Sequence, residues 1–350
     1  MLRVLLYTLF GLVGGGRGLF VPRGTYDRQP PREVLVLAPG DIPTTDLYLR
    51  GRLERQYGKV VRYVDTFRSA PQEIVLGDAM IVIVRHAPLR WLRWLGQRRD
   101  QLSGVVFLMD DDIPAAAAAS ELPFFYAMKT AWRYACARRL LGRLCSEVWV
   151  STPELMRRYE SSSPRLWEPA YVGESSTAHT VAPVYFYHGS WAHRREIEWL
   201  VPIVGRIQEN CPDAWFEIIG TDRVKQLFRG IPRVRTVHPM SWKDYLAYAG
   251  TVRYQVGLAP CFDTDFNRAR SHSKMFDITR LGAAGIYSNV TPYAEKVVDG
   301  KTGLLCDNDP DKWVASLTLL LNNSVLRSSI YSGARKWCDE INILKYVNSQ

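Results

Sequence analysis

The residues best suited to chemistry lie between positions 271 and 305 of this 350-residue chain. Ser273, Lys274 and Asp277 precede an apolar stretch with helical spacing that stops at a glycine, followed by a short strand at 286–288. Lys274 and Asp277 fall in the first turn of the predicted helix. Because a helix N-terminus is electropositive, a lysine beside it suits a diphosphate. An acid in the same turn suits a pair of ribose hydroxyls.

A second group of polar residues follows the predicted strand 184–187. Gly189 and Ser190 permit the close approach of a phosphate, and His193 or Arg194 would neutralise its charge. Ligands of open α/β sheets gather at the carboxyl ends of the strands, where this turn lies. The pattern predicts a phosphate-binding turn, with an ordinary Gly-Ser turn as the alternative.

Polar residues also end two strands in the first half of the chain. His86 follows the strand 79–84, and three aspartates follow the apolar strand 104–109. The aspartates are Asp110, Asp111 and Asp112. His86 or one of the first two aspartates would serve as a base toward a hydroxyl group. Aspartates at a strand end would also bind a divalent metal or cap a turn, so these interpretations stay open.

Strands and helices alternate along the chain in two series, which predicts two doubly wound α/β domains with parallel sheets. The strands expected in the first series are 34–38, 60–64, 79–84, 104–109 and 147–150. Those expected in the second are 184–187, 215–219, 234–237, 255–259 and 286–288. Helices are expected between them, including one over 46–56 and one from 124 to 145 that is interrupted near Gly142.

An irregular polar stretch, 161–180, marks the expected domain boundary. The predicted organisation is an apolar N-terminal extension (1–24), a first domain (25–178), a second domain (179–335) and a C-terminal helix (336–350). That last helix could cross back to the first domain.

The order of these motifs resembles the donor-binding segment of GT-B glycosyltransferases, in particular the large retaining family called family 4. Asp277 stands where that family has its second glutamate, and residues 298–305 match the ending that follows it. The resemblance implies two Rossmann-like domains facing a cleft, with a nucleotide-sugar held by the second domain. It implies donor contacts from Gly189, Ser190, His193, Arg194, His238, Arg270, Ser273, Lys274 and Asp277.

The sequence departs from the family at one position. Ala269 stands where the family has the first glutamate of its E-x7-E pair. Either Asp263 or Asp265 substitutes for it or the role is absent, so the retaining or inverting outcome stays open. The pair Ser273-Lys274 resembles the Ser-Lys pair of several bacterial polysaccharide transferases with the same fold.

Composition narrows the class of partner. The net charge is +10 with a pI near 9.3, which suits sugar nucleotides or an anionic membrane surface. No nucleic-acid-binding signature is present, so nucleic acid is not expected as a partner. Six scattered cysteines without a CxxC pair argue against a zinc site and indicate a reduced, cytosolic protein.

Residues 1–22 are apolar, but the central run 4–13 is too short to span a bilayer. With Arg3, Arg17 and Arg23 beside it, the segment is interpreted as an interfacial helix. It would hold the protein on the inner face of the cytoplasmic membrane. A helix packed against the first domain is the alternative.

The sequence therefore predicts a glycosyltransferase of hexosyl or deoxyhexosyl type. It would move a sugar from a nucleotide-sugar to a glycan or lipid-linked acceptor in bacterial surface polysaccharide synthesis, such as that of lipopolysaccharide. No metal or other cofactor is expected. One alternative is a metal-dependent GT-A type transferase that uses Asp110 and Asp112. The other is a non-catalytic sugar- or nucleic-acid-binding protein on the GT-B scaffold.

Overall fold

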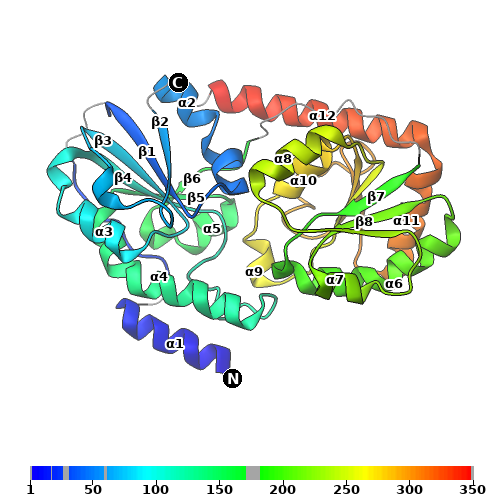
Figure 1. The fold of residues 1–350 in the computed structure, drawn as a ribbon, viewed down its shortest axis with the longest axis horizontal. Helices are drawn as coiled ribbons and strands as arrows, with labels where there is room; N and C mark the ends of the chain where they lie inside the picture. The colour runs from blue at the N-terminus through cyan, green and yellow to red at the C-terminus, as the bar shows by residue number, and fades with distance from the viewer. Residues whose placement is uncertain (1, 17, 27–30, 59–60, 171–181, 348–350) are drawn as a thin grey trace. The chain divides into compact units, whose positions relative to one another are not determined.

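The computed structural model describes residues 2–16, 18–26, 31–58, 61–170 and 182–347 (Figure 1). The chain divides into two compact units. Unit 1 comprises residues 1–169 and 269–271, and unit 2 comprises 170–268 and 272–350. Each unit contains a six-stranded parallel sheet, which confirms the predicted fold class. The predicted boundary at 178/179 lies outside the described residues.

The sheet of unit 1 has the strand order β2-β1-β3-β4-β5-β6. Its strands are β1 (Glu33–Ala38), β2 (Val61–Asp65), β3 (Ala79–Val84), β4 (Leu102–Met109), β5 (Glu147–Val150) and β6 (Arg165–Leu166). The chain proceeds from β1 to β2 on one side and from β3 onward on the other. The point where the strand order reverses, the switch point of the sheet, therefore lies between β1 and β3. The alternation of strand and helix patterns in the sequence predicted all of these strands except the two-residue β6.

The α-helices of unit 1 are α1 (Leu2–Gly14), α2 (Arg52–Tyr57), α3 (Leu89–Gly96), α4 (Phe124–Leu144) and α5 (Pro153–Arg158). The single helix predicted over 46–56 is instead a π-helical turn, η1 (Thr45–Leu49), followed by α2. Gly51 separates them with a φ of 72°, which ends the first helix. The break predicted near Gly142 is absent from α4. Gly142 faces the carbonyl of Val21, so its missing side chain gives room to the neighbouring segment.

Unit 2 has the strand order β12-β11-β10-β7-β8-β9, with its switch point between β7 and β10. Its strands are β7 (Val184–Tyr187), β8 (Trp215–Ile219), β9 (Val234–Val237), β10 (Val256–Ala259), β11 (Ala284–Ser288) and β12 (Leu304–Cys306). Its helices are α6 (Arg194–Asn210), α7 (Asp222–Leu227), α8 (Trp242–Thr251), α9 (Asp265–Arg268), α10 (Ser273–Arg280), α11 (Pro310–Asn322) and α12 (Ser324–Val347). The predicted return of the last helix to the first domain stays a prediction.

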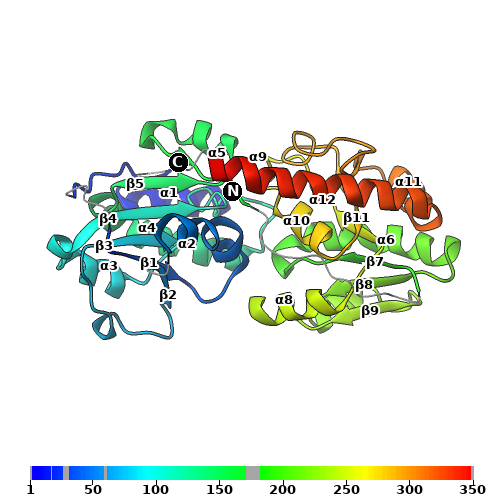
Figure 2. The ribbon, with the colours of Figure 1, turned by 90° about the horizontal axis from the view of Figure 1, so that it is seen from above.

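Helices cover both faces of the unit 2 sheet. Along β7, Tyr185 and Tyr187 belong to one buried cluster, together with residues of α6 and α11. Val184 and Phe186 belong to a second cluster, with residues of α8 and α10. Figure 2 shows α12 lying beside α10 and α11. Because successive side chains of a strand point to opposite faces, this alternation is what a doubly wound sheet requires.

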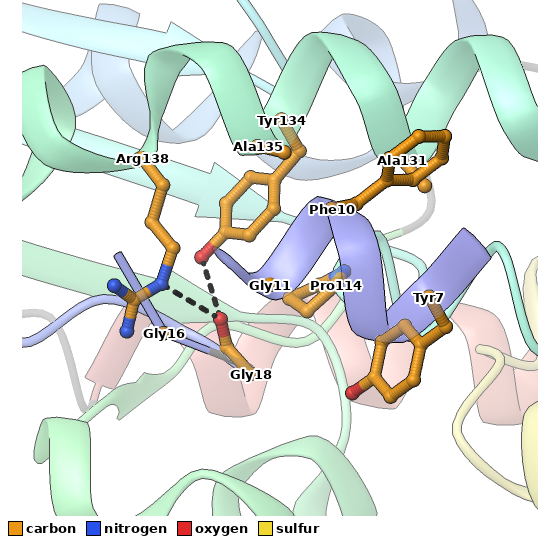
Figure 3. A pocket seen from close by; sticks show the side chains of 10 residues that line it. All are labelled: Tyr7, Phe10, Gly11, Gly16, Gly18, Pro114, Ala131, Tyr134, Ala135 and Arg138. Carbon is orange, nitrogen blue, oxygen red and sulfur yellow. Dashed lines mark hydrogen bonds between the residues drawn. The ribbon is translucent and has the colours of Figure 1, made fainter. Parts of the chain in front are cut away.

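Helix α1 packs along α4 in unit 1. Arg3 donates hydrogen bonds to the carbonyls of Ala119 and Leu122 at 2.6 and 2.8 Å. Beyond the end of α1, Tyr134 and Arg138 of α4 both bond the carbonyl of Gly18, as Figure 3 shows. These contacts agree with the alternative interpretation of residues 1–22 as a helix packed on the first domain. Among the described residues, no helix has the length and apolar content needed to cross a bilayer.

All six cysteines are free thiols. Five of them, Cys145, Cys211, Cys261, Cys306 and Cys338, are buried, and Cys136 is half-buried on α4. The five buried thiols occupy ordinary core positions, which agrees with the absence of a paired cysteine motif.

Gly333→Ala tests how tightly α12 packs on unit 2. A Cβ at Gly333 would lie 2.2 Å from the carbonyl oxygen of Lys301, so the helix and this loop would have to separate. We expect a loss of about 1–3 kcal/mol in the free energy of unfolding, measured by urea titration. Gly250→Ala on the exposed side of α8 is the control, because a Cβ there meets nothing within 4 Å. Equal stability of the two variants would contradict this packing.

Candidate functional site

Most of the predicted donor residues gather at the switch point of the unit 2 sheet. Lys274, in the first turn of α10, donates a hydrogen bond of 2.6 Å to the carbonyl of His188, directly after β7. Its Nζ also lies 4.6 Å from the centre of the Tyr187 ring. Gly189 permits this arrangement, because a Cβ there would come within 2.9 Å of the Tyr187 ring. The turn after β7 and the N-terminus of α10 are thus in direct contact.

The N-terminus of α6 lies at the same edge of the sheet, since α6 follows β7 after a short 3-10 turn. Ser190 is exposed, and its carbonyl accepts a hydrogen bond from the backbone N–H of His193. His193 Nδ1 lies 3.7 Å from Glu196. Arg194 is exposed and pairs with Glu198 at 2.6 Å. The guanidinium of Arg194 is therefore accessible to an anion that can compete with one surface carboxylate.

Asp277 lies one turn after Ser273, on the partly exposed side of α10. Its carboxylate pairs with Arg280 at 2.8 Å. Burial raises the pKa of Asp277, although the charges of Arg280 and Lys274 act in the opposite direction. The carboxylate has a cationic partner and remains partly open to solvent, so it can accept further hydrogen bonds.

A buried polar network lies behind the His188 turn. Glu217, in the middle of β8, is fully buried and accepts hydrogen bonds from His188, Tyr248 and Tyr254 at 3.1, 2.8 and 2.5 Å. Its second oxygen pairs with Arg235. The other ring nitrogen of His188 lies 3.3 Å from the Tyr245 hydroxyl. The carbonyl of His188 accepts the hydrogen bond from Lys274, and both ring nitrogens of His188 have partners that hold the side chain in place.

This network determines the ionisation of its members. Burial alone would raise the pKa of Glu217, but the hydrogen bonds from His188 and the tyrosines lower it to about 2. Burial also lowers the pKa of His188, although Glu217 opposes that effect. The pair therefore favours an ionised glutamate beside a neutral imidazole.

The aspartates after β4 lie at the switch point of the unit 1 sheet. Asp110 is buried and forms a bidentate pair with Arg85 at 2.6 and 2.5 Å, while Thr44 donates a third bond at 2.7 Å. Burial would raise the pKa of Asp110, but Arg85 and Thr44 hold it below its usual value. Arg85 follows β3 with a φ of 61°, a rare conformation for a residue other than glycine. Asp110 is thus fully engaged within the protein.

Asp111 is the most accessible of the three aspartates, with 29% of its side chain exposed. It lies 3.4 Å from Arg85 and 3.8 Å from Arg270. Burial raises the pKa of Asp111, and the charge of Asp110 adds to this effect. Asp112 is fully buried, pairs with Arg158 at 2.5 Å and bonds Tyr159 and the backbone N–H of Ala115. The three aspartates therefore have different environments, and Asp112 has the capping role.

His86 ends β3 beside Arg85. An N–H of Arg133 lies 3.2 Å from its Nε2. Since a guanidinium can only donate, this nitrogen must be the acceptor. Burial, together with the charges of Arg133 and Arg85, lowers the pKa of His86 to about 4. The imidazole is therefore neutral at pH 7, with one nitrogen already engaged.

The other residues considered from the sequence lie on other segments of the chain. Arg270 belongs to unit 1 and faces Asp111. His238 is exposed after the edge strand β9. Asp263 and Asp265, the possible substitutes for the missing glutamate, are exposed and pair with Arg268.

Sequence reasoning did not select Glu217, Thr44 or Arg85 as site residues. Glu217 carried a signal, since it is the one charged residue in the strand Trp-Phe-Glu-Ile-Ile. A charge inside an apolar strand is rarely buried without partners. Arg85 was adjacent to a chosen residue, but nothing in the sequence paired it with Asp110.

Within the described part of the chain, no group of three or more histidine, cysteine or acidic side chains is placed to hold a metal ion. Asp110 and Asp112, the pair that a GT-A interpretation requires, both have cationic partners within unit 1. The two parallel sheets, one in each unit, also fit the GT-B interpretation better than the GT-A interpretation.

No family model and no curated protein sequence matches this chain. Several solved structures resemble it. HepE from Anabaena in complex with UDP-glucose aligns with a TM-score of 0.55 at 12% identity, over 91% of this chain and all of HepE. Sucrose-phosphate synthase from Thermosynechococcus elongatus aligns with a TM-score of 0.51 at 15% identity, over 77% of this chain and 72% of that protein.

The S. aureus protein TarM, as a point mutant in complex with UDP, fondaparinux and α-GlcNAc-glycerol, aligns with a TM-score of 0.55 at 11% identity. The alignment covers 79% of this chain, which spans just over half of TarM (56%). The structural neighbours are GT-B glycosyltransferases, and at these identities the likeness establishes the shared fold.

Glu217→Gln tests the buried network. The folded pKa of about 2 lies below the ordinary 4.5, so the ionised carboxylate stabilises the fold above pH 4.5 and this contribution is lost as pH falls toward 2. We expect the variant to lose about 2 kcal/mol of unfolding free energy at neutral pH. The difference from wild type should shrink in acid.

Urea unfolding at neutral and acidic pH measures this effect. Glu209→Gln, at the exposed end of α6, is the control and should leave stability nearly unchanged. A loss for Glu217→Gln that stays constant with pH would contradict the assignment of an ionised, hydrogen-bonded carboxylate.

Proposed function

We propose that this protein is a glycosyltransferase that uses a nucleotide-sugar donor. The observation that carries the proposal is the contact between Lys274 at the start of α10 and the glycine turn after β7. This contact lies at the switch point of the unit 2 sheet, the usual ligand position in such folds. The shared fold with UDP-bound glycosyltransferase structures supports the same conclusion.

The donor diphosphate would lie between the N-termini of α6 and α10. Lys274 would exchange its bond to the His188 carbonyl for a phosphate oxygen, and Arg194 would leave Glu198 for the same purpose. The backbone N–H groups of both helix starts and the small residues Gly189 and Ser190 would complete the cradle. Asp277 would accept hydrogen bonds from the ribose hydroxyls, and its pair with Arg280 would favour the ionised form. His193 lines the same turn.

The leaving nucleotide diphosphate carries negative charge that must be stabilised as the sugar–phosphate bond breaks. Lys274, Arg194 and the two helix N-termini would supply that stabilisation at fixed positions. The proposed transfer is therefore metal-independent and requires no cofactor. Turnover that depends on an added divalent cation would favour the alternative class of metal-dependent transferase.

Asp111 is the residue proposed as base toward the acceptor hydroxyl. Of the three candidates, Asp110 is engaged by Arg85 and Thr44, and His86 has one nitrogen occupied and a lowered pKa. Asp111 is partly exposed and has a raised pKa, which suits proton acceptance. Arg270, 3.8 Å from Asp111, would orient its carboxylate, and the donor contact of Arg270 stays a prediction. His238 remains a proposal for the nucleobase side.

The acceptor is proposed to be a glycan or lipid-linked glycan of bacterial surface polysaccharide synthesis, such as lipopolysaccharide. The transferred sugar is proposed to be a hexose or deoxyhexose. A basic protein with an apolar N-terminal helix would work as a peripheral enzyme on the inner face of the cytoplasmic membrane. The fold alone also fits a non-catalytic binding protein, which sugar transfer would exclude.

Lys274→Ala and Asp277→Asn test the donor site. We expect each variant to bind a nucleoside diphosphate about tenfold or more weakly, because a charged hydrogen bond contributes about 1.5–3 kcal/mol. Calorimetric titration with a panel of nucleotides and sugar nucleotides in EDTA measures this. Lys225→Ala, an exposed lysine on α7, is the matched control. Wild-type affinity in both site variants would refute the assignment.

Asp111→Asn tests the base. We expect the turnover number to fall by about a hundredfold or more with nearly unchanged donor affinity, since only proton transfer is lost. Asp110→Asn should instead lower the free energy of unfolding by about 3 kcal/mol, because it weakens a buried ion pair. The assay would use the sugar nucleotide that binds most tightly. Full transfer activity in Asp111→Asn would rule out this role.

A further inference from the structure

Helices α1 and α4 of unit 1 pack together, and both expose large apolar side chains. Among them are Leu2, Leu5, Leu9 and Leu12 on α1 and Phe125 and Trp132 on α4. These six residues are called the α1–α4 face below. Leu12 is 72% exposed and Phe125 is 85% exposed. The ring of Trp132 contacts Phe10 of α1, with ring centroids 5.4 Å apart, so the two helices that carry these exposed side chains pack together.

The four leucines follow one another at steps of three, four and three positions, which places them on one side of the helix. That side differs from the one that packs on α4. The packed side includes Arg3, Phe10 and Gly14, which all contact residues of the unit. The leucines are therefore not needed to attach α1, and a soluble surface rarely exposes such a row without a partner.

The charges near the α1–α4 face indicate which kind of partner it would bind. The sequences of α1, α3 and α4 contain no aspartate or glutamate. On α4, exposed basic residues lie at helical spacing on the same side of the helix as Phe125 and Trp132. These are Lys129, Arg139 and Arg143. An apolar row beside cations with no acid among them suits an anionic bilayer surface. This positive charge opposes pairing with a second copy of the chain, because two such faces would repel each other.

We propose that the α1–α4 face docks on a bilayer that contains anionic lipid. The leucines, Phe125 and Trp132 would enter the boundary between headgroups and acyl chains, and Lys129, Arg139 and Arg143 would contact the headgroups. The inference deepens the proposed function, because this surface would bring the enzyme to a lipid-linked acceptor. It assigns docking to two helices instead of to residues 1–22 alone.

Deleting residues 1–22 would be a poor test, because Leu19 and Phe20 belong to the core of unit 1. Tyr134 also donates a hydrogen bond to the carbonyl of Gly18. Substitutions on the exposed side leave these contacts in place. Phe125→Asp tests α4 with residues 1–22 intact, and Leu9→Asp tests the row on α1.

The experiment is sedimentation of the full chain with phosphatidylcholine vesicles, with and without phosphatidylglycerol, at low and high salt. We expect binding to anionic vesicles that weakens with salt, and at least about tenfold weaker binding for Phe125→Asp and for Leu9→Asp. Val75→Asp and Val325→Asp are the controls, since both side chains are exposed, at 81% and 80%, and lie off the face. They should bind within about twofold of wild type.

Several results would overturn the proposal. Wild-type vesicle binding by Phe125→Asp would remove α4 from the surface, and failure of the wild-type chain to bind anionic vesicles would remove the whole face. Self-association that Leu9→Asp abolishes would make the face a contact between copies. Thermal unfolding of each variant checks the fold. Nucleotide titration is independent of vesicle binding, so a failed docking proposal is distinguishable from a failed donor site.

Discussion

The parallel pairing of β7 with β10 determines where unit 2 can do chemistry. The two strands lie side by side with Val256 opposite Tyr185, although about seventy residues separate them in sequence. From this pair the chain proceeds outward through β8 and β9 on one side and through β11 and β12 on the other. The loops that leave β7 and β10 therefore diverge, and the N-termini of α6 and α10 face the space between them. The bond from Lys274 to the His188 carbonyl lies there.

The sheet of unit 1 has a different strand order but also a switch point, between β1 and β3, and the residues there differ from those in unit 2. Thr44 comes from the segment after β1, Arg85 from the end of β3 and Asp110 from the end of β4, and the three side chains satisfy one another. The corresponding place in unit 2 has a lysine bonded to a backbone carbonyl and two helix N-termini. Unit 2 therefore places a lysine beside helix N-termini, whereas unit 1 has a nearly balanced group of charges in which Asp111 keeps the most solvent access.

The sequence predicted most strands correctly because buried parallel strands are short runs of Val, Ile and Leu bounded by turn residues. It also placed Lys274 and Asp277 in the first turns of a helix that begins at Ser273. It could not predict interactions between residues far apart in the chain. Glu217 and His188 are 29 positions apart, and no local pattern links them. The strands β6 and β12 have two and three residues, too few for alternation to be visible.

The acidic neighbour of Arg270 could not be predicted from sequence either. Arg270 lies four positions before Lys274, yet the segment 269–271 packs with unit 1, where Thr152 donates a hydrogen bond to the carbonyl of Ala269. Proximity in sequence suggested a shared ligand, whereas tertiary packing gave Arg270 an acidic neighbour in Asp111. Whether a side chain near a helix start faces the helix ligand depends on packing that is decided elsewhere in the chain.

Labelling of the buried cysteines can report local unfolding of the protein. Burial raises the pKa of the thiols of Cys145, Cys211 and Cys306, so alkylating reagents, which attack the thiolate, find little to react with in the folded chain. Cys145 belongs to unit 1, and Cys211 and Cys306 belong to unit 2. The order in which these thiols become labelled under mild denaturant would therefore report which unit loosens first.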